Sequence, residues 1–188
     1  SREAAHAIAQ FAFDYAKNEG RRRITVAHKA SVMRLTDGLF CDVVGEVSEN
    51  YPFVETEFLE VDNVALKLAQ DPGVFDVLLL ENLFGDIVSD MGAGLVGGLG
   101  LVPGANIGDS VAVFEAVHGS APDIAGQGKA NPIALLLSAA LMLHHIGERK
   151  RAQEINDAVG QVLSAGATLT PDLGGTASTQ ELTQAIIE

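Results

Sequence analysis

The chain has 188 residues, of which 47% are apolar, so it is long enough for one domain or one and a half with a sizeable core. Its formal net charge is −13 and its longest basic run is Arg21-Arg22-Arg23, which argues against nucleic acid as a partner. The single cysteine, Cys41, excludes an internal disulfide framework and indicates a reducing compartment. No apolar run reaches the ~18 residues of a membrane span, and no signal peptide is visible, so no membrane partner is expected.

The spacing of apolar residues predicts helices that alternate with strands. Expected helices cover residues 3–18, 31–49, 63–70, 131–146, 149–163 and 178–187, with one more after a turn at Asn82. Expected strands cover residues 22–27, 53–61, 77–80 and 111–114. In the second helix, Val32 and Leu35 begin the apolar face, and the continuous apolar run from Val77 to Leu80 suits a buried strand. This alternation predicts an α/β fold with largely parallel pairing.

Two aspartates follow the turn at Asn82. Asp86 and Asp90 are four residues apart, so in a helix they share one face, where two carboxylates repel each other unless a cation lies between them. One interpretation is a Mg²⁺ or Mn²⁺ site. The other is that Asp86 caps the helix start and Asp90 is a solvated surface residue. The spacing alone leaves both open.

Polar residues also follow two other predicted strands. Lys29 comes after the first strand, and Asp62 comes at the end of the second. Ligands of open α/β sheets collect at the carboxyl ends of strands, where a lysine near carboxylates and a metal can have a lowered pKa and transfer protons. The simpler alternatives are a solvated strand end for Lys29 and a helix N-cap for Asp62.

The loop from His118 to Asn131 combines exposed amides, small residues, an acid and an imidazole. An acid in a nucleotide-binding loop accepts hydrogen bonds from ribose hydroxyls and repels a 2′-phosphate, which separates NAD from NADP. An ordinary surface loop remains the alternative. The glycine-rich stretch 94–108 does not match the G-x-G-x-x-G fingerprint and indicates only tight turns and close backbone approach.

Taken together, these motifs resemble the metal-dependent decarboxylating β-hydroxyacid dehydrogenases, a family that includes isocitrate, 3-isopropylmalate, homoisocitrate and tartrate dehydrogenases. The motifs that carry the resemblance are HKA at 28–30, DGLF at 37–40, VDN at 61–63, NLFGDIVSD at 82–90, GLVGGLGLVPGANIG at 94–108, VFEAVHGSAPDIAG at 113–126, ANP at 130–132 and TPDLGGTAST at 170–179. The HKA and M-x-x-x-DGLF run is most similar to NAD-dependent isocitrate dehydrogenases, and homoisocitrate dehydrogenases come second.

The resemblance implies a role for each matched residue. Lys29 matches the active-site lysine, and Asp62 matches the metal aspartate; both serve the site of a neighbouring subunit, and we expect both to be catalytic. Asp86 and Asp90 match the metal aspartates of the same subunit, so the implied metal set is Asp62, Asp86 and Asp90. The matched cofactor residues are Glu115, His118, Gly119, Ser120, Ala121, Asp123, Ile124 and Asn131, with Asp172 at a further cofactor-side position. Asp123-Ile124 is the NAD-type pair. One departure is Ser31, which stands where many members carry asparagine.

The resemblance also implies a fold and an organisation. We expect part of an isocitrate/isopropylmalate dehydrogenase-like fold, with mixed, mostly parallel sheets flanked by helices. Residues 1–97 are expected in the smaller dimer-forming domain that binds substrate and metal, and residues 98–188 in the larger nucleotide-binding domain. The match covers only the C-terminal half of the family pattern: its substrate-gripping arginines, its serine or threonine that reads the substrate side chain, and its catalytic tyrosine are not located here.

The implied activity is NAD-dependent oxidative decarboxylation of a hydroxy di- or tricarboxylate, with isocitrate converted to 2-oxoglutarate as in the tricarboxylic acid cycle. Homoisocitrate or 3-isopropylmalate is the alternative substrate. A truncated or regulatory subunit that only pairs with a partner chain is the alternative from another class. The expected cofactors are NAD and Mg²⁺ or Mn²⁺, and a homodimer or higher oligomer is expected to share its active sites. The expected location is the cytoplasm, or the mitochondrial matrix in a eukaryote, and the isolated chain is expected to be inactive.

Overall fold

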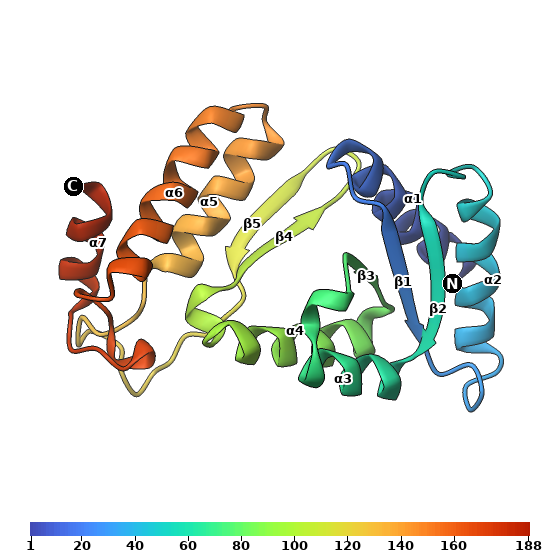
Figure 1. Ribbon diagram of the computed structural model, residues 1–188, viewed down its shortest axis with the longest axis horizontal. Coiled ribbons are helices and arrows are strands. Elements are labelled where there is room, and N and C mark those ends of the chain that lie inside the picture. Colours follow the sequence, from blue (N-terminus) through green and yellow to red (C-terminus); the bar gives the residue numbers. More distant parts are fainter. The chain divides into compact units, whose positions relative to one another are not determined.

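The computed structural model in Figure 1 describes all residues from Ser1 to Glu188. The chain divides into two compact units, Ser1–Gly92 and Ala93–Glu188, which we call the N-terminal and C-terminal units. The division falls within helix α4 (Asn82–Val96). The roles predicted for residues 1–97 and 98–188 stay predictions. None of the helices combines the length and the apolar character that crossing a membrane requires.

The N-terminal unit is built on a three-stranded parallel sheet with the order β2-β1-β3. Its strands are β1 (Arg23–His28), β2 (Glu55–Glu60) and β3 (Val77–Leu79). Successive side chains of a strand point to opposite faces. In β1, Ile24 and Val26 therefore join the core cluster of α1 (Arg2–Asn18) and α2 (Thr36–Ser48). Ala27 joins a second cluster with α3 (Val61–Gln70) and α4. A central strand that is buried on both faces explains the continuous apolar run.

Two predicted boundaries in this unit are wrong. Helix α2 begins at Thr36 rather than at residue 31, and Val32 and Leu35 are 72% and 89% exposed. Residues 30–35 form turns, in which the backbone N–H groups of Val32 and Met33 donate to the Lys29 carbonyl at 2.9 and 2.8 Å. Strand β2 ends at Glu60 and α3 begins at Val61, two residues before the predicted start. Asp62 therefore lies in the first turn of α3 rather than at its N-cap.

The C-terminal unit contains an antiparallel ribbon and three helices. The ribbon pairs β4 (Pro103–Ile107) with β5 (Ala112–Ala116), and the helices are α5 (Ile133–His145), α6 (Arg149–Ala165) and α7 (Thr179–Ile187). Short 3₁₀ turns occur at η1 (Pro72–Val74) in the first unit and at η2 (Leu99–Leu101) and η3 (Pro171–Leu173) in this one. The core joins α5, α6 and α7 through Ile133, Val159 and Leu182. No strand was predicted at β4.

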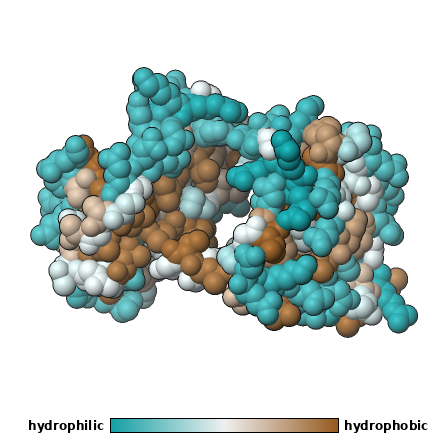
Figure 2. Space-filling model, in the orientation of Figure 1, coloured by the Kyte–Doolittle hydropathy of each residue, from teal (hydrophilic) through white to brown (hydrophobic).

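Helix α5 exposes large apolar side chains. Leu135 is 61% exposed, and Leu141 and Met142 are 39% and 40% exposed. Ile146, which caps the helix, is 63% exposed. Figure 2 shows brown apolar residues reaching the surface of this unit. A helix that is apolar on nearly every side is typical of the interior of a larger core, and an exposed apolar patch of this kind marks a surface for interaction.

Candidate active site

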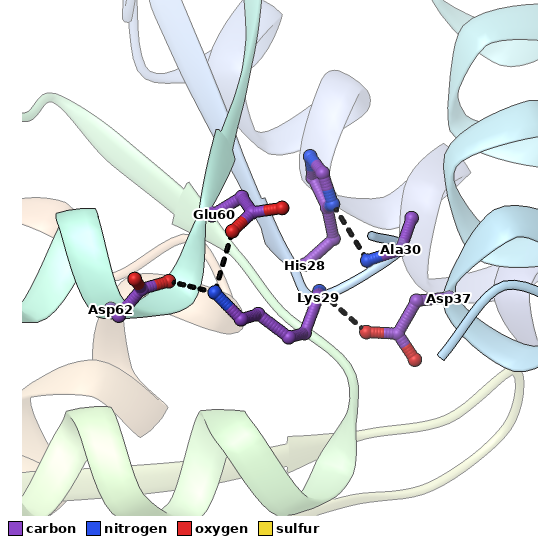
Figure 3. Close-up of polar contacts among 6 residues, drawn as sticks. All are labelled: His28, Lys29, Ala30, Asp37, Glu60 and Asp62. Carbon is purple, nitrogen blue, oxygen red and sulfur yellow. Dashed lines mark hydrogen bonds and ion pairs between the residues drawn. The ribbon is translucent and has the colours of Figure 1, made fainter. Parts of the chain in front are cut away.

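The carboxyl ends of β1 and β2 bring a lysine and two carboxylates together. The two strands are parallel, and their register places His28 of β1 opposite Glu60 of β2. Lys29 follows β1, and its Nζ lies 2.5 Å from Glu60 Oε2 and 2.5 Å from Asp62 Oδ1 (Figure 3). The structure therefore joins Lys29 and Asp62, the two residues predicted to act together.

Charge in this cluster favours the ionised forms. The Asp62 and Glu60 carboxylates raise the pKa of the Lys29 ammonium above its ordinary value. In return, Lys29 lowers the pKa of both carboxyls. The lowered pKa expected for a lysine near carboxylates and a metal stays a prediction; here the charges nearest to Lys29 are anions, and an anion stabilises the ammonium. Glu60 and Lys29 are 30% and 26% exposed at their side chains, whereas Asp62 is 63% exposed.

A buried aspartate fixes the backbone that carries Lys29. Asp37 is only 3% exposed, and its Oδ2 accepts a 2.7 Å hydrogen bond from the Lys29 backbone N–H. One residue further on, the Ala30 N–H donates to His28 Nδ1 at 3.1 Å. A hydrogen bond from Ser31 to the Glu60 carboxylate also lowers the pKa of Glu60. Sequence reasoning missed Glu60, and it gave no role to Asp37, which begins the DGLF motif at 37–40.

Asp86 and Asp90 lie one turn apart on α4, and both are exposed. The interpretation of Asp86 as a helix cap is wrong, because α4 begins at Asn82 and its first turn is capped by Glu81. The Glu81 carboxylate accepts from the backbone N–H groups of Leu83 and Phe84, both at 2.9 Å.

The acid pair of α4 is available to a ligand. No side-chain hydrogen bond or ion pair engages Asp86 or Asp90, and no group of three or more His, Cys, Asp or Glu residues of this chain could hold a metal ion. Two free carboxylates one turn apart fit a hard divalent cation that takes its other ligands from elsewhere. The metal set that includes Asp62 of a second chain stays a prediction.

The C-terminal unit contains a cavity of about 770 Å³. Of the predicted cofactor residues, the following line it: His118, Gly119, Ser120, Ala121, Ile124 and Asn131, together with Asp172. Two predicted residues are not in its lining. Glu115, on β5, accepts a 2.8 Å hydrogen bond from Asn106 Nδ2, and Asp123 lies exposed on the loop.

The base of the cavity is closely packed. Asn131 is 8% exposed, its Oδ1 accepts from the Ile133 N–H at 3.0 Å, and its Nδ2 donates to Asp172 Oδ2 at 2.9 Å. A Cβ at Gly100 would lie 2.9 Å from Asp172 Oδ2, so only glycine fits there without displacement. Ala121 has a φ of +41°, a strained backbone for a non-glycine residue. A cavity of this volume, with close backbone approach at Gly100 and polar side chains such as Asn131 and Asp172 in its lining, fits a nucleotide cofactor. Sequence reasoning missed Gly100.

Comparison with known proteins places this geometry in a family. The sequence profile described as isocitrate/isopropylmalate dehydrogenase matches residues 1–186. The isocitrate/homoisocitrate dehydrogenase of Thermus thermophilus is 51% identical over 100% of this chain and 56% of its own length. The mitochondrial NAD isocitrate dehydrogenase catalytic subunit 5 of Arabidopsis thaliana is 50% identical over 100% of this chain and 50% of its own length.

A solved structure also resembles this chain closely. The crystal structure of isocitrate dehydrogenase from Methylococcus capsulatus superposes with a TM-score of 0.96 at 46% identity, covering 100% of this chain and 56% of that one. The fold is therefore that of the isocitrate dehydrogenases, as predicted. The chain belongs to the isocitrate/isopropylmalate dehydrogenase family. It spans about half the length of the relatives it matches. Its assignment to the C-terminal half stays a prediction.

Proposed function

We propose that this chain is one half of an NAD-dependent dehydrogenase that oxidises and decarboxylates a 2-hydroxy acid with a β-carboxylate. The proposed substrate is isocitrate. The observation that carries the proposal is the cluster at the strand ends, where Lys29 Nζ contacts Glu60 and Asp62 at 2.5 Å each. A lysine held between carboxylates lies at the carboxyl edge of a parallel sheet, where its neutral amine would accept the proton that the substrate hydroxyl loses on oxidation.

Two bound groups would supply the rest of the chemistry. NAD, held by the cavity of the C-terminal unit, would accept the hydride. A divalent cation, held by Asp86 and Asp90 with Asp62 of a second chain, would stabilise negative charge on substrate oxygens. Within the protein, Lys29 moves the proton, Glu60 and Asp62 hold its ammonium in place, and Asp37 fixes its backbone.

The exposed face of α4 supports a homodimer or higher oligomer with shared sites. Leu83 and Ile87 are each 59% exposed and, by helical spacing, lie on the same side of α4 as Asp86 and Asp90. A second chain that covers this apolar pair also brings its own groups close to the two acids. The exposed side chains of α5 further support a chain that acts inside a larger protein.

The substrate is the finer part of the proposal. Besides the isocitrate/homoisocitrate dehydrogenase at 51% identity, a 3-isopropylmalate dehydrogenase from Archaeoglobus fulgidus is 50% identical. These relatives support homoisocitrate and 3-isopropylmalate as the alternatives to isocitrate. The proposed location is the cytoplasm of a prokaryote or the mitochondrial matrix of a eukaryote, in keeping with the mitochondrial relative from Arabidopsis.

A regulatory role is the second candidate function. A relative from Dictyostelium discoideum, named as a regulatory subunit of mitochondrial NAD isocitrate dehydrogenase, is 49% identical over 100% of this chain. Such a chain would pair with a catalytic partner and would form no NADH by itself. The free pair Asp86 and Asp90 favours the catalytic function.

Turnover of the complete polypeptide tests the proposal. We expect Mn²⁺-dependent NADH formation with isocitrate at a higher kcat/KM than with homoisocitrate or 3-isopropylmalate. Asp86→Asn should lower turnover on the order of 100-fold or more, because a metal ligand is lost. The exposed Asp42→Asn on α2 is the matched control and should leave turnover unchanged. Full activity of the Asp86 variant would refute the metal assignment. Activation of a catalytic partner without turnover of its own would establish the regulatory function.

A further inference from the structure

The loop that walls the cavity has two parts that are held differently. The hydrogen bonds of residues 118–127 all lie within that segment. The Ile124 N–H donates to the Ala121 carbonyl at 3.1 Å, and the Gln127 N–H donates to the Ile124 carbonyl at 3.1 Å. Gln127 Nε2 donates to the Asp123 carbonyl at 2.7 Å, and the His118 ring contacts the Gly119 carbonyl. Residues 128–131 are instead bound by residues more than 40 positions later in the chain. Residues 118–127 are therefore held only at their two ends, by β5 through Val117 and by residues 128–131.

Thr179 makes two of the contacts that hold residues 128–131. Its Oγ1 donates to the Ala130 carbonyl at 2.5 Å, and its backbone N–H donates to the Gly128 carbonyl at 2.7 Å. The two carbonyls stand on either side of Lys129, which lines the cavity. Thr179 is the first residue of α7, so its N–H has no acceptor within the helix and is free for the loop.

The helix start that carries Thr179 is itself rigid. Ser178 and Glu181 form a capping box: the Ser178 N–H donates to Glu181 Oε2 at 2.8 Å, and the Glu181 N–H donates to Ser178 Oγ at 3.2 Å. Leu182, one residue later, is fully buried in the core of the unit. Because the start of α7 is rigid, Thr179 can hold the carbonyl groups that it binds in a fixed position.

We propose that Thr179 is a positioning residue for the dinucleotide: its hydroxyl holds the Lys129 backbone and the loop beyond it in the shape that binds NAD. The inference rests on the proposed function. The donor residue Thr179 and the acceptor residue Ala130 both line the cavity, as does Lys129. A loop fixed before the ligand arrives loses less conformational entropy on binding.

The chain offers a conservative rescue and a matched control. Thr179→Val removes the hydroxyl but keeps the shape and the backbone contact to Gly128, whereas Thr179→Ser keeps the hydroxyl. Thr183→Val removes a hydroxyl from the same helix, where Thr183 Oγ1 donates to the Thr179 carbonyl at 2.7 Å and does not reach the loop.

The experiment compares wild type with these three variants in the complete polypeptide, by amide hydrogen exchange and by NADH titration followed by NADH fluorescence. Loss of one hydrogen bond predicts that Thr179→Val speeds exchange in residues 118–131 and raises the Kd for NADH, each about threefold to tenfold. Thr179→Ser and Thr183→Val should stay within about twofold of wild type in both the exchange rate of residues 118–131 and the Kd for NADH.

Each outcome decides the matter. If Thr179→Val equals Thr183→Val on both readouts, or if loop exchange speeds up while the Kd is unchanged, the positioning role is refuted and the proposed function stands. If wild type binds no NADH, the dinucleotide function of this unit is refuted, and the positioning role falls with it even when the exchange pattern is as expected.

Discussion

Gly100 lies where three elements meet at the base of the cavity, and Gly100→Ala probes that packing directly. The added Cβ would lie 2.9 Å from Asp172 Oδ2 and 3.1 Å from Asn131 Cβ. Asn131 cannot retreat, because it is 8% exposed and its Oδ1 holds the Ile133 N–H at the start of α5. The Asp172 carboxylate must therefore move, and its 2.9 Å hydrogen bond from Asn131 Nδ2 is lost.

The size of the effect follows from two opposing terms. A hydrogen bond to a charged group stabilises the folded state by about 1.5–3 kcal/mol. Replacing glycine by alanine restricts the unfolded chain and returns about 0.4–1 kcal/mol. Gly100→Ala should thus lower the free energy of unfolding by about 1–2 kcal/mol.

Urea unfolding followed by circular dichroism measures this loss, and hydrogen exchange of the Ile133 amide localises it. The matched control is Gly160→Ala in the middle of α6, where a Cβ meets nothing within 4 Å. That change should raise the free energy of unfolding by about 0.5–1 kcal/mol through helix propensity. If Gly100→Ala were as stable as wild type, with an unchanged Ile133 amide, the account of the cavity base would be wrong.

Three further predictions concern other parts of the chain. The pKa of Asp76 lies below its ordinary value of 3.8, mainly because its carboxylate accepts a hydrogen bond from the Arg22 backbone N–H. The ionised Asp76 carboxylate therefore stabilises the folded state above pH 3.8, and this stabilisation is lost as the pH falls through the folded-state pKa. Asp76→Asn should cost about 1 kcal/mol at pH 7 and progressively less as the pH falls below 3.8 in urea unfolding, and a pH-independent difference would contradict this. Burial raises the pKa of the Cys41 thiol to about 11, so its reaction with a disulfide reagent at pH 8 should be roughly 100-fold slower than in urea; equal rates would contradict the burial. Gly175→Ala drives a Cβ into the Leu169 carbonyl group and should lower the free energy of unfolding by about 3 kcal/mol, whereas wild-type stability would refute the close approach.

Hydrophobic pattern alone located the parts of the fold whose burial is continuous. Strand β1 was predicted to within one residue because Ile24 to Ala27 are all fully buried and leave an unbroken signal. The start of α2 was wrong because Val32 and Leu35 have helical spacing by coincidence, while the turn before α2 is set by the buried side chain of Asp37. Strand β4 was missed because its sequence, PGANI, contains residues that strands avoid, and pairing with β5 makes up for this.

The candidate site was predictable residue by residue, but its assembly was not. Lys29 and Asp62 could each be recognised at a strand end, yet their contact depends on the register that sets His28 opposite Glu60. That register is a long-range property with no local sequence signal, and so Glu60 was overlooked. In the same way, the loop 118–131 was predicted to bind a nucleotide, whereas Thr179, which donates to the Ala130 carbonyl, lies 49 residues beyond Ala130.

Shared active sites are the central claim, and complementation between two inactive variants of the complete polypeptide tests it most directly. Asp62→Asn keeps Asp86 and Asp90 intact, and Asp86→Asn keeps Asp62 intact. Each variant alone should be inactive. In a mixed dimer one site receives both wild-type aspartates, so refolding the two variants together should restore about a quarter of wild-type NADH formation. If mixed dimers form and remain as inactive as either variant, the two aspartates do not serve one site across the interface, and the account is contradicted.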